Sequence, residues 1–272
     1  MKDSGNTFSK NENIKGSLFR WTPESAMWYE KASQFTGYHD RLAEILRPYI
    51  DKSQTCLEIA CGTGTLARHL CGMAASYTAN DIDKNATYHL REMIKDGSCP
   101  GLEVVNGDWA EVFKDRTFDN VIFSYFGAVV NDWDILKKIA GKQLIVITPQ
   151  KKDGRMKVAA EKAEAEKNNP DSPKRIVRGA VRSFETGVSV SDFLDSKGAK
   201  YIRSDHVLEF GQPFDNLSQA REYTRYYYRI DEKDMDFFLE KKLIKKDGIW
   251  FFPKKKEISV IVIDMAEENS ET

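Results

Sequence analysis

Between residues 56 and 148, short apolar runs alternate with helix-like stretches, and this alternation constrains the fold more than any other feature of the 272-residue sequence. The pattern is typical of βαβ units, in which crossover helices join parallel strands. We expect strands at residues 56–60, 76–79, 102–105, 120–125 and 143–148, and helices at residues 65–71, 84–95 and 132–140. Five such repeats in about a hundred residues predict an open, doubly wound sheet, because a barrel needs eight repeats and roughly 250 residues.

The flanking segments extend this core into a single α/β domain over residues 17–272. Residues 1–16 are polar and are expected to be a flexible N-terminus. An N-terminal helical cover is expected over residues 17–52, because Thr22-Pro23 reads as an N-cap followed by proline at the first helical position. An Ala/Glu/Lys-rich helix at residues 156–167 predicts a lid insertion over residues 150–198.

The remaining elements complete a Rossmann-like, seven-stranded, mostly parallel sheet. We expect a helix at residues 188–197, a sixth strand at 200–210, helices at 216–229 and 232–243, and a terminal antiparallel hairpin formed by residues 249–252 and 257–264. The pattern contains no internal repeat and no linker long enough to separate two domains.

The composition excludes several classes of partner. The 41 Lys and Arg balance 42 Asp and Glu, so the chain has no global basic field and a nucleic-acid partner is disfavoured. The longest apolar runs, at 144–147 and 260–263, are too short to cross a bilayer, so we expect no membrane partner and a cytoplasmic location. The four cysteines have no zinc-ligand spacing, so neither a metal site nor a disulfide is expected.

The first strand runs directly into a glycine loop, Glu58-Ile59-Ala60-Cys61-Gly62-Thr63-Gly64, and then into an amphipathic helix. A strand, a tight glycine turn and a helix N-terminus bring bare backbone close to a ligand. A glycine turn needed only for close packing of the strand on the helix is the alternative interpretation.

Acidic residues within or just after successive strands strengthen the ligand interpretation. Asp81 ends the second strand and Asp108 follows the third, while Glu58 lies within the first. The carboxyl ends of parallel strands face one crevice. Glu58 is suited to an ammonium group, Asp81 to a pair of ribose hydroxyls, and Asp108 to an adenine amino group. A loop cap or surface charge explains any one of them equally well, but the three together favour a ligand.

These residues carry a family resemblance. The segments from Glu58, Thr78, Asn106 and Phe118 resemble motif I and the following motifs of class I S-adenosylmethionine-dependent methyltransferases over residues 22–150. The resemblance implies that the cofactor is S-adenosyl-L-methionine. The cofactor site it implies comprises Tyr29, Glu58, Ala60, Cys61, Gly62, Gly64, Asp81, Ile82, Asp108, Trp109 and Ser124.

In that family the glycine loop passes under the methionine part of the cofactor, which assigns this role to Gly62 and Gly64. The same comparison assigns Asp81 to the ribose and Asp108 to the adenine. One departure is Ala60, which stands where the family has its first glycine. A dinucleotide-dependent oxidoreductase is the rival interpretation of the loop, but Glu58 and Asp108 have no role in dinucleotide binding.

The sequence constrains the methyl acceptor less than it constrains the cofactor. After the fourth strand the chain has Ser124-Tyr125-Phe126-Gly127 and lacks the Asn/Asp-Pro-Pro-aromatic sequence of enzymes that methylate planar amino groups of bases or glutamine. Methyl transfer needs a general base chiefly when the acceptor is a hydroxyl, and His39, Tyr125 and His206 are the candidate catalytic residues. Basic segments at 151–182 and 241–256 could bind an anionic acceptor, although such runs are more often solvated faces.

We therefore expect a methyltransferase that acts on a small-molecule O, N or S nucleophile. An RNA or protein methyltransferase is one alternative. A non-catalytic partner subunit that binds the cofactor is another, and only Ala60 points to it.

Overall fold

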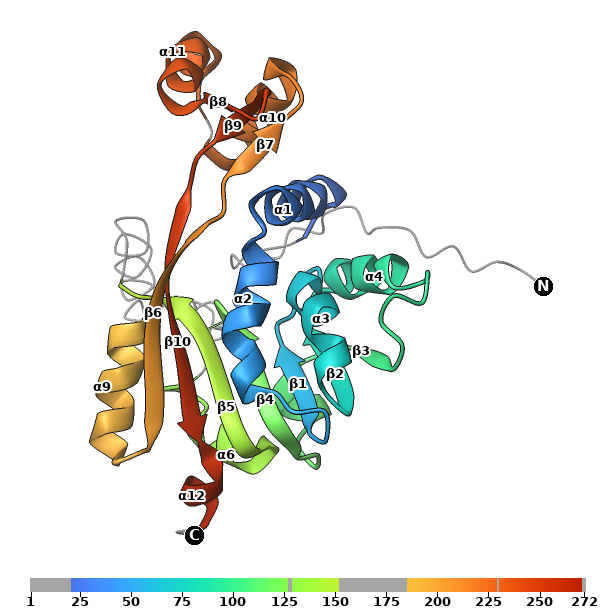
Figure 1. The fold of residues 1–272 in the computed structure, drawn as a ribbon, viewed down its shortest axis with the longest axis vertical. Coiled ribbons are helices and arrows are strands. Elements are labelled where there is room, and N and C mark those ends of the chain that lie inside the picture. The colour runs from blue at the N-terminus through green and yellow to red at the C-terminus, as the bar shows by residue number, and fades with distance from the viewer. Residues whose placement is uncertain (1–20, 127–128, 152–184, 229, 271–272) are drawn as a thin grey trace, which may run out of the picture.

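The structure, a computed structural model, describes residues 21–126, 129–151, 185–228 and 230–270. Its centre is a seven-stranded sheet in the order β3-β2-β1-β4-β5-β10-β6 (Figure 1). The strands are β1 (Thr55–Ile59), β2 (Ser76–Asp81), β3 (Leu102–Asn106), β4 (Phe118–Ser124), β5 (Ala140–Pro149), β6 (Tyr201–Glu209) and β10 (Lys255–Asp264). The first five pair in parallel and β10 is antiparallel to both β5 and β6. The predicted doubly wound α/β fold is confirmed, with the strand order reversing between β1 and β4.

Helices cover both faces of this sheet. They are α1 (Pro23–Thr36), α2 (Tyr38–Leu46), α3 (Thr65–Leu70), α4 (Lys84–Met93), α5 (Trp109–Val112), α6 (Trp133–Ile139), α9 (Gly187–Lys197) and α12 (Met265–Ser270), with 3₁₀ turns at Arg47–Tyr49 and Cys71–Met73. Apolar side chains of α2, α3 and α4 form one core with one face of the sheet, and those of α5, α6 and α9 form a second core with the other. In β5, Ile145 and Ile147 face the first core while Leu144 and Val146 face the second, so a continuous apolar run is buried on both sides.

The first helix forms as the sequence predicts. Thr22 caps α1 by accepting a hydrogen bond from the Ser25 N–H at 3.2 Å, and Pro23 occupies its first turn. The helix ends at Gly37, whose φ of 63° is a left-handed conformation that glycine adopts without strain. The predicted flexible segment 1–16 and the predicted helix 156–167 lie outside the described residues. Of the expected lid, α9 packs Val190 and Leu194 into a sheet-facing core.

A small lobe is inserted between β6 and β10. It consists of β7 (Gln212–Phe214), α10 (Leu217–Tyr228), α11 (Glu232–Lys242), β8 (Ile244–Lys246) and β9 (Ile249–Phe252), which share a separate core. Figure 1 shows this lobe beyond the carboxyl ends of the parallel strands, next to α1. Trp28 of α1 contacts it through edge-on ring packing with Tyr223 and Tyr226 at 5.4 and 5.2 Å.

The antiparallel hairpin is present, but its partners differ from those predicted. Residues 249–252 pair with β8 and β7, whereas residues 257–264 lie in β10 at the interior of the large sheet. Burial explains the difference: Val260 faces one core and Ile261 the other, so β10 needs a neighbour on each edge and cover on each face. Among the described residues, no helix has the length and apolar character to cross a membrane.

Candidate functional site

The glycine loop turns sharply between β1 and α3. Ala60, Gly62 and Gly64 all have positive φ angles, of 54°, 57° and 72°. The Cys61 N–H donates to the Asn80 carbonyl at 2.9 Å, which attaches the loop to β2. Ala60 therefore follows the path that a glycine would take, at a backbone cost of about 1 kcal/mol, and its departure from the family motif leaves the loop geometry in place.

Asp81 connects the end of β2 to this loop. Its carboxylate accepts hydrogen bonds from the backbone N–H groups of Gly62 and Asp83, both at 2.8 Å. The residue is only 8% exposed, and burial raises the pKa of its carboxyl from 3.8 to about 6. A carboxylate held in this way can accept further hydrogen bonds from ligand hydroxyls at the carboxyl edge of the sheet.

Glu58 lies deeper, within β1, and is 2% exposed. It accepts a hydrogen bond from the Tyr77 hydroxyl at 2.9 Å, and burial raises the pKa of its carboxyl to about 8. In the described part of the chain, no Lys or Arg forms an ion pair with it. A buried carboxyl without a basic partner is suited to receive a ligand cation, because that cation would compensate the charge that burial disfavours.

The residues expected to contact the adenine, Ile82, Asp108 and Trp109, differ in their exposure to solvent. Asp108 caps α5 by accepting the Ala110 N–H at 3.1 Å, and Ile82 is 50% exposed. Trp109, the first residue of α5, is 3% exposed and packs within the core. Asp108 and Ile82 thus lie on accessible loops after β3 and β2, while Trp109 is part of the packing beneath them.

The helical cover reaches the glycine loop. The Trp21 ring lies against Gly62, such that a Cβ at Gly62 would be 2.9 Å from the ring. The Trp21 N–H donates to Asp83 at 2.8 Å, and the Trp21 ring meets Tyr29 edge-on at 5.3 Å. Glu30 of α1 accepts a hydrogen bond from Thr65 at 2.6 Å and forms an ion pair with Arg68. The cover is therefore attached both to the loop and to α3.

Two of the three predicted catalytic residues lie at this cover, His39 as part of its helix α2 and Tyr125 in contact with Tyr38 of that helix. His39 is 3% exposed; its Nδ1 lies 2.6 Å from the Ser33 hydroxyl and its Nε2 lies 3.1 Å from the Tyr29 hydroxyl. Burial holds the pKa of His39 well below its usual value. With both ring nitrogens engaged, His39 positions Tyr29 and has no free nitrogen to act as a base.

Tyr125 directly follows β4, with a φ of 58°, and shares a 3.3 Å hydroxyl–hydroxyl contact with Tyr38. Burial raises the pKa of Tyr125 well above its usual value, so it is protonated at neutral pH. The preceding residue, Ser124, ends β4 and is half-buried.

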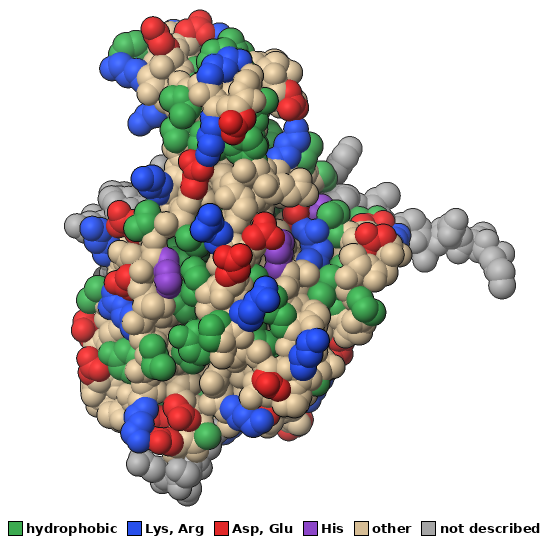
Figure 2. All heavy atoms as spheres, viewed as in Figure 1, with side chains coloured by type: hydrophobic (Ala, Val, Ile, Leu, Met, Phe, Trp, Pro, Cys, Tyr) green, Lys and Arg blue, Asp and Glu red, His purple; other side chains and the backbone are tan. Residues whose placement is uncertain are grey.

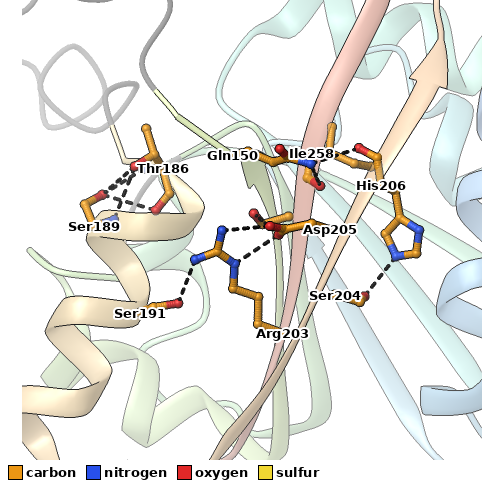
Figure 3. A network of polar contacts seen from close by, with 10 residues as sticks. Gln150, Thr186, Ser189, Ser191, Arg203, Ser204, Asp205, His206 and Ile258 are labelled. Atoms are coloured by element: carbon orange, nitrogen blue, oxygen red, sulfur yellow. Dashed lines mark hydrogen bonds and ion pairs between the residues drawn. The ribbon is translucent and has the colours of Figure 1, made fainter.

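His206 lies in a different environment, on the edge strand β6. Its Nε2 is 2.9 Å from the Ser204 hydroxyl, and Gln150 donates to the His206 and Ile258 carbonyls (Figure 3). In the same view Arg203 bridges Asp205 and Ser191 of α9. The described contacts of His206 join strands and bring it to neither Glu58 nor Asp81.

The residue that sequence reasoning missed is Lys256, at the start of β10. Its Nζ lies over four aromatic rings, with centroid distances of 4.0 Å to Phe210, 4.5 Å to Tyr125, 4.7 Å to Tyr38 and 5.8 Å to Tyr29. We call these four rings the aromatic cage. The sequence does contain a signal, because side chains alternate along a strand and Lys256 shares a face with Ile258 and Val260.

Other members of the basic segment 241–256 have partners of their own. Lys241 lies over the Phe237 ring and Lys245 over the Trp250 ring, each at 4.1 Å, and Lys246 pairs with Glu209 at 2.5 Å. Figure 2 shows basic and acidic side chains interspersed over the visible face, including the small lobe. Apart from Lys151, the basic segment 151–182 lies outside the described residues.

Comparisons with known proteins agree with this geometry. The methyltransferase-domain family matches residues 56–141. A candidate methyltransferase from Bacillus halodurans C-125 is similar in fold, with a TM-score of 0.50 and 13% identity over 84% of this chain and 99% of that chain. The YcgJ protein from Bacillus subtilis has a TM-score of 0.50 and 12% identity over 83% and 98%. No curated protein matches the sequence. Identities this low establish a shared fold and leave the chemistry to the site.

Proposed function

We propose that this chain, whose residues 56–141 match the methyltransferase-domain family, is a class I S-adenosylmethionine-dependent methyltransferase that binds S-adenosyl-L-methionine and transfers the methyl group to a small-molecule O, N or S nucleophile. The cofactor supplies a methyl group activated on a sulfonium, which leaves as a neutral thioether. The protein's contribution is to align the nucleophile and exclude water.

One observation carries the proposal: Asp81 holds the Gly62 N–H while Glu58 lies buried in the adjacent strand without a basic partner. The loop and Asp81 suit a nucleoside at the carboxyl edge of the sheet. Glu58 suits the positive charge of an amino-acid ammonium group. A ligand with both features, a nucleoside joined to an amino acid, fits these residues better than a dinucleotide, which has no ammonium group to donate hydrogen bonds to Glu58.

The cover adds the exclusion of water that methyl transfer requires. Trp21 lies on the glycine loop, and Glu30 anchors α1 to Thr65 at the start of α3. A cover attached at both points favours a small acceptor over a folded RNA or protein, which would need a larger opening. Strong dependence of acceptor binding on salt would instead favour RNA.

The test is calorimetric titration of the full chain with S-adenosylmethionine and S-adenosylhomocysteine. Asp81→Ala removes the charge-assisted hydrogen bonds to the Gly62 and Asp83 N–H groups and the contact proposed for the ribose, so we expect its affinity for both ligands to fall about 100-fold. Asp115→Ala, which changes an exposed aspartate, is the matched control and should bind like the unaltered chain. Absence of binding by the unaltered chain would refute the proposal.

A further inference from the structure

The aromatic cage is assembled from four separate parts of the chain. Tyr29 comes from α1, Tyr38 from α2, Tyr125 from the residue after β4, and Phe210 from the residue after β6. Further contacts fix the rings against one another, with Tyr38 edge-on to Phe210 at 4.8 Å and Tyr29 tilted against Phe210 at 5.1 Å. The cage is thus a product of the whole fold, and its rings converge on a single position.

The group that occupies this position is poorly matched to it. A lysine ammonium carries three N–H donors and is strongly hydrated. Among the described residues, no hydrogen bond or ion pair holds Lys256 Nζ, and its contacts there are with the rings. Burial, with Lys254 nearby, lowers the pKa of Lys256 from 10.5 to about 7.

An alkylated amine is better matched. It has fewer N–H donors to satisfy and a weaker hydration shell, so it loses less on entering a site built of ring faces. Aromatic cages are known receptors for methylated and quaternary ammonium groups for this reason. The same surroundings that lower the pKa of Lys256 would keep a bound amine unprotonated, with its lone pair available for attack.

The cage also borders the region assigned to the methyl donor. Tyr29 contacts Trp21, which lies on Gly62 of the glycine loop. Tyr125 follows β4, the strand next to β1 in the sheet. Lys256 follows the exposed residues 253–255 along the chain and is itself half-buried. Its flexible side chain can therefore withdraw toward solvent without a change in the fold.

We propose that the aromatic cage binds the nitrogen of the methyl acceptor and that this acceptor is an alkylated aliphatic amine. Lys256 Nζ occupies the cage until the acceptor displaces it. The proposal rests on the proposed methyltransferase function and narrows its acceptor from an O, N or S nucleophile to an amine. It is compatible with the absence of the Asn/Asp-Pro-Pro-aromatic sequence after β4, because that sequence serves planar amino groups.

The reaction balances without another reactant. The nitrogen lone pair forms a bond to the methyl carbon as the carbon–sulfur bond breaks, and the electron pair of that bond remains on sulfur. The product is a more highly alkylated ammonium, which loses a proton to water where it carries one. Positive charge develops on nitrogen in the transition state, and the ring faces stabilise it there.

The test uses choline as a cationic probe and 3,3-dimethylbutan-1-ol as its neutral isostere, titrated calorimetrically into the full chain without cofactor. Lys256→Ala removes the amine from the aromatic cage, and Lys255→Ala changes an exposed neighbour as the matched control. We expect Lys256→Ala to bind choline about tenfold more tightly than the unaltered chain and Lys255→Ala do. Lys256→Ala should also bind choline at least about tenfold more tightly than it binds the alcohol. Adding Phe210→Leu to Lys256→Ala should reduce the choline affinity about fivefold, with circular dichroism confirming the fold.

Equal choline affinities in the three proteins, or equal binding of choline and the alcohol, would overturn the proposal. So would methylation of Lys256 itself on incubation with S-adenosylmethionine, detected as a mass increase on the peptide that contains it. Because choline binding is measured without cofactor, its failure leaves the cofactor titration of the proposed function intact. Failure of the cofactor titration would remove the methyl donor and overturn both proposals.

Discussion

We call the glycine loop with Asp81 the donor side, after the cofactor proposed to bind there, and the aromatic cage the acceptor side, after the proposed acceptor. On the donor side, the glycine loop and Asp81 are joined by one hydrogen bond between neighbouring strand ends. On the acceptor side, the aromatic cage takes each ring from a different element, separated by up to 181 positions between Tyr29 and Phe210 (210 − 29). The donor side depends on local backbone geometry, whereas the acceptor side depends on long-range packing. A shared fold can therefore keep the first while the second changes freely.

The two sides also perturb ionisation in opposite directions. Burial raises the pKa of the Glu58 carboxyl to about 8 and lowers the pKa of the Lys256 ammonium to about 7. Both shifts favour the neutral form, so each group is poised to respond to a ligand charge. The donor side lacks a basic side chain beside Glu58, while the acceptor side already holds the amine of Lys256 among the rings.

The largest effect is expected from Glu58→Gln. The folded protein retains a proton on Glu58 that the unfolded chain releases near its ordinary pKa of 4.5, so the Glu58 contribution to the free energy of unfolding falls as pH rises from 4.5 to about 8. The glutamine variant lacks this fall and should be more stable than the unaltered chain by about 5 kcal/mol at pH 9. Urea unfolding at pH 4 and pH 9 measures it.

In that comparison the two proteins should differ little at pH 4, where Glu58 is protonated in both states. Asp81, with a pKa of about 6, contributes a fall of the same sign but remains in both proteins. An equal difference in stability at the two pH values would show that Glu58 does not titrate as described.

A smaller effect is expected from two matched arginine substitutions. Arg68→Met leaves Glu30 buried without its ion-pair partner, and we expect a loss of about 2–3 kcal/mol. Arg225→Met breaks an exposed pair with Glu232 on the small lobe, and solvent screening should make its effect on stability much smaller than that of Arg68→Met. Chemical unfolding measures both, and equal losses would contradict the assignment of Arg68 as the attachment of the cover.

The smallest difference is expected between two glycine substitutions. Gly64 and Gly97 both have positive φ, but a Cβ at Gly64 would lie 2.4 Å from Leu90 while one at Gly97 meets nothing within 4 Å. Both alanine variants carry backbone strain, and Gly64→Ala should cost about 1–2 kcal/mol more because of overpacking. Melting temperatures test this, and an equal shift for the two variants would show that Leu90 moves aside freely.

The donor side could be predicted from sequence because its residues follow one another at strand ends. The strands from β1 to β5 were each located within a few residues, and the glycine loop and Asp81 meet as their positions indicate. Whether they bind the cofactor as assigned stays a prediction. Trp109 shows a limit of prediction from sequence position, because the neighbouring Asp108 is accessible while the Trp109 indole ring packs into the core.

The acceptor side could not be predicted from the sequence, for a different reason. Lys256 ends a run of lysines that composition assigns to solvent, and only its strand parity places it with Ile258 and Val260. The pairing of β9 was missed because residues 249–252 and 257–264 are close in sequence, yet burial on both faces draws β10 into the large sheet. Neither fact is available before the layers of the fold are known.

The chain leaves the large sheet at β6 and returns at the neighbouring β10, and the Phe210 N–H donates to the Lys254 carbonyl at 2.8 Å across that junction. The small lobe is therefore an insertion whose two ends lie side by side, joined by this hydrogen bond. A tight turn could replace residues 211–253 and leave the strand order unchanged. Phe210 and Lys256 flank the junction, so replacing the lobe would change what lies beside the aromatic cage and leave the glycine loop and Asp81 as they are.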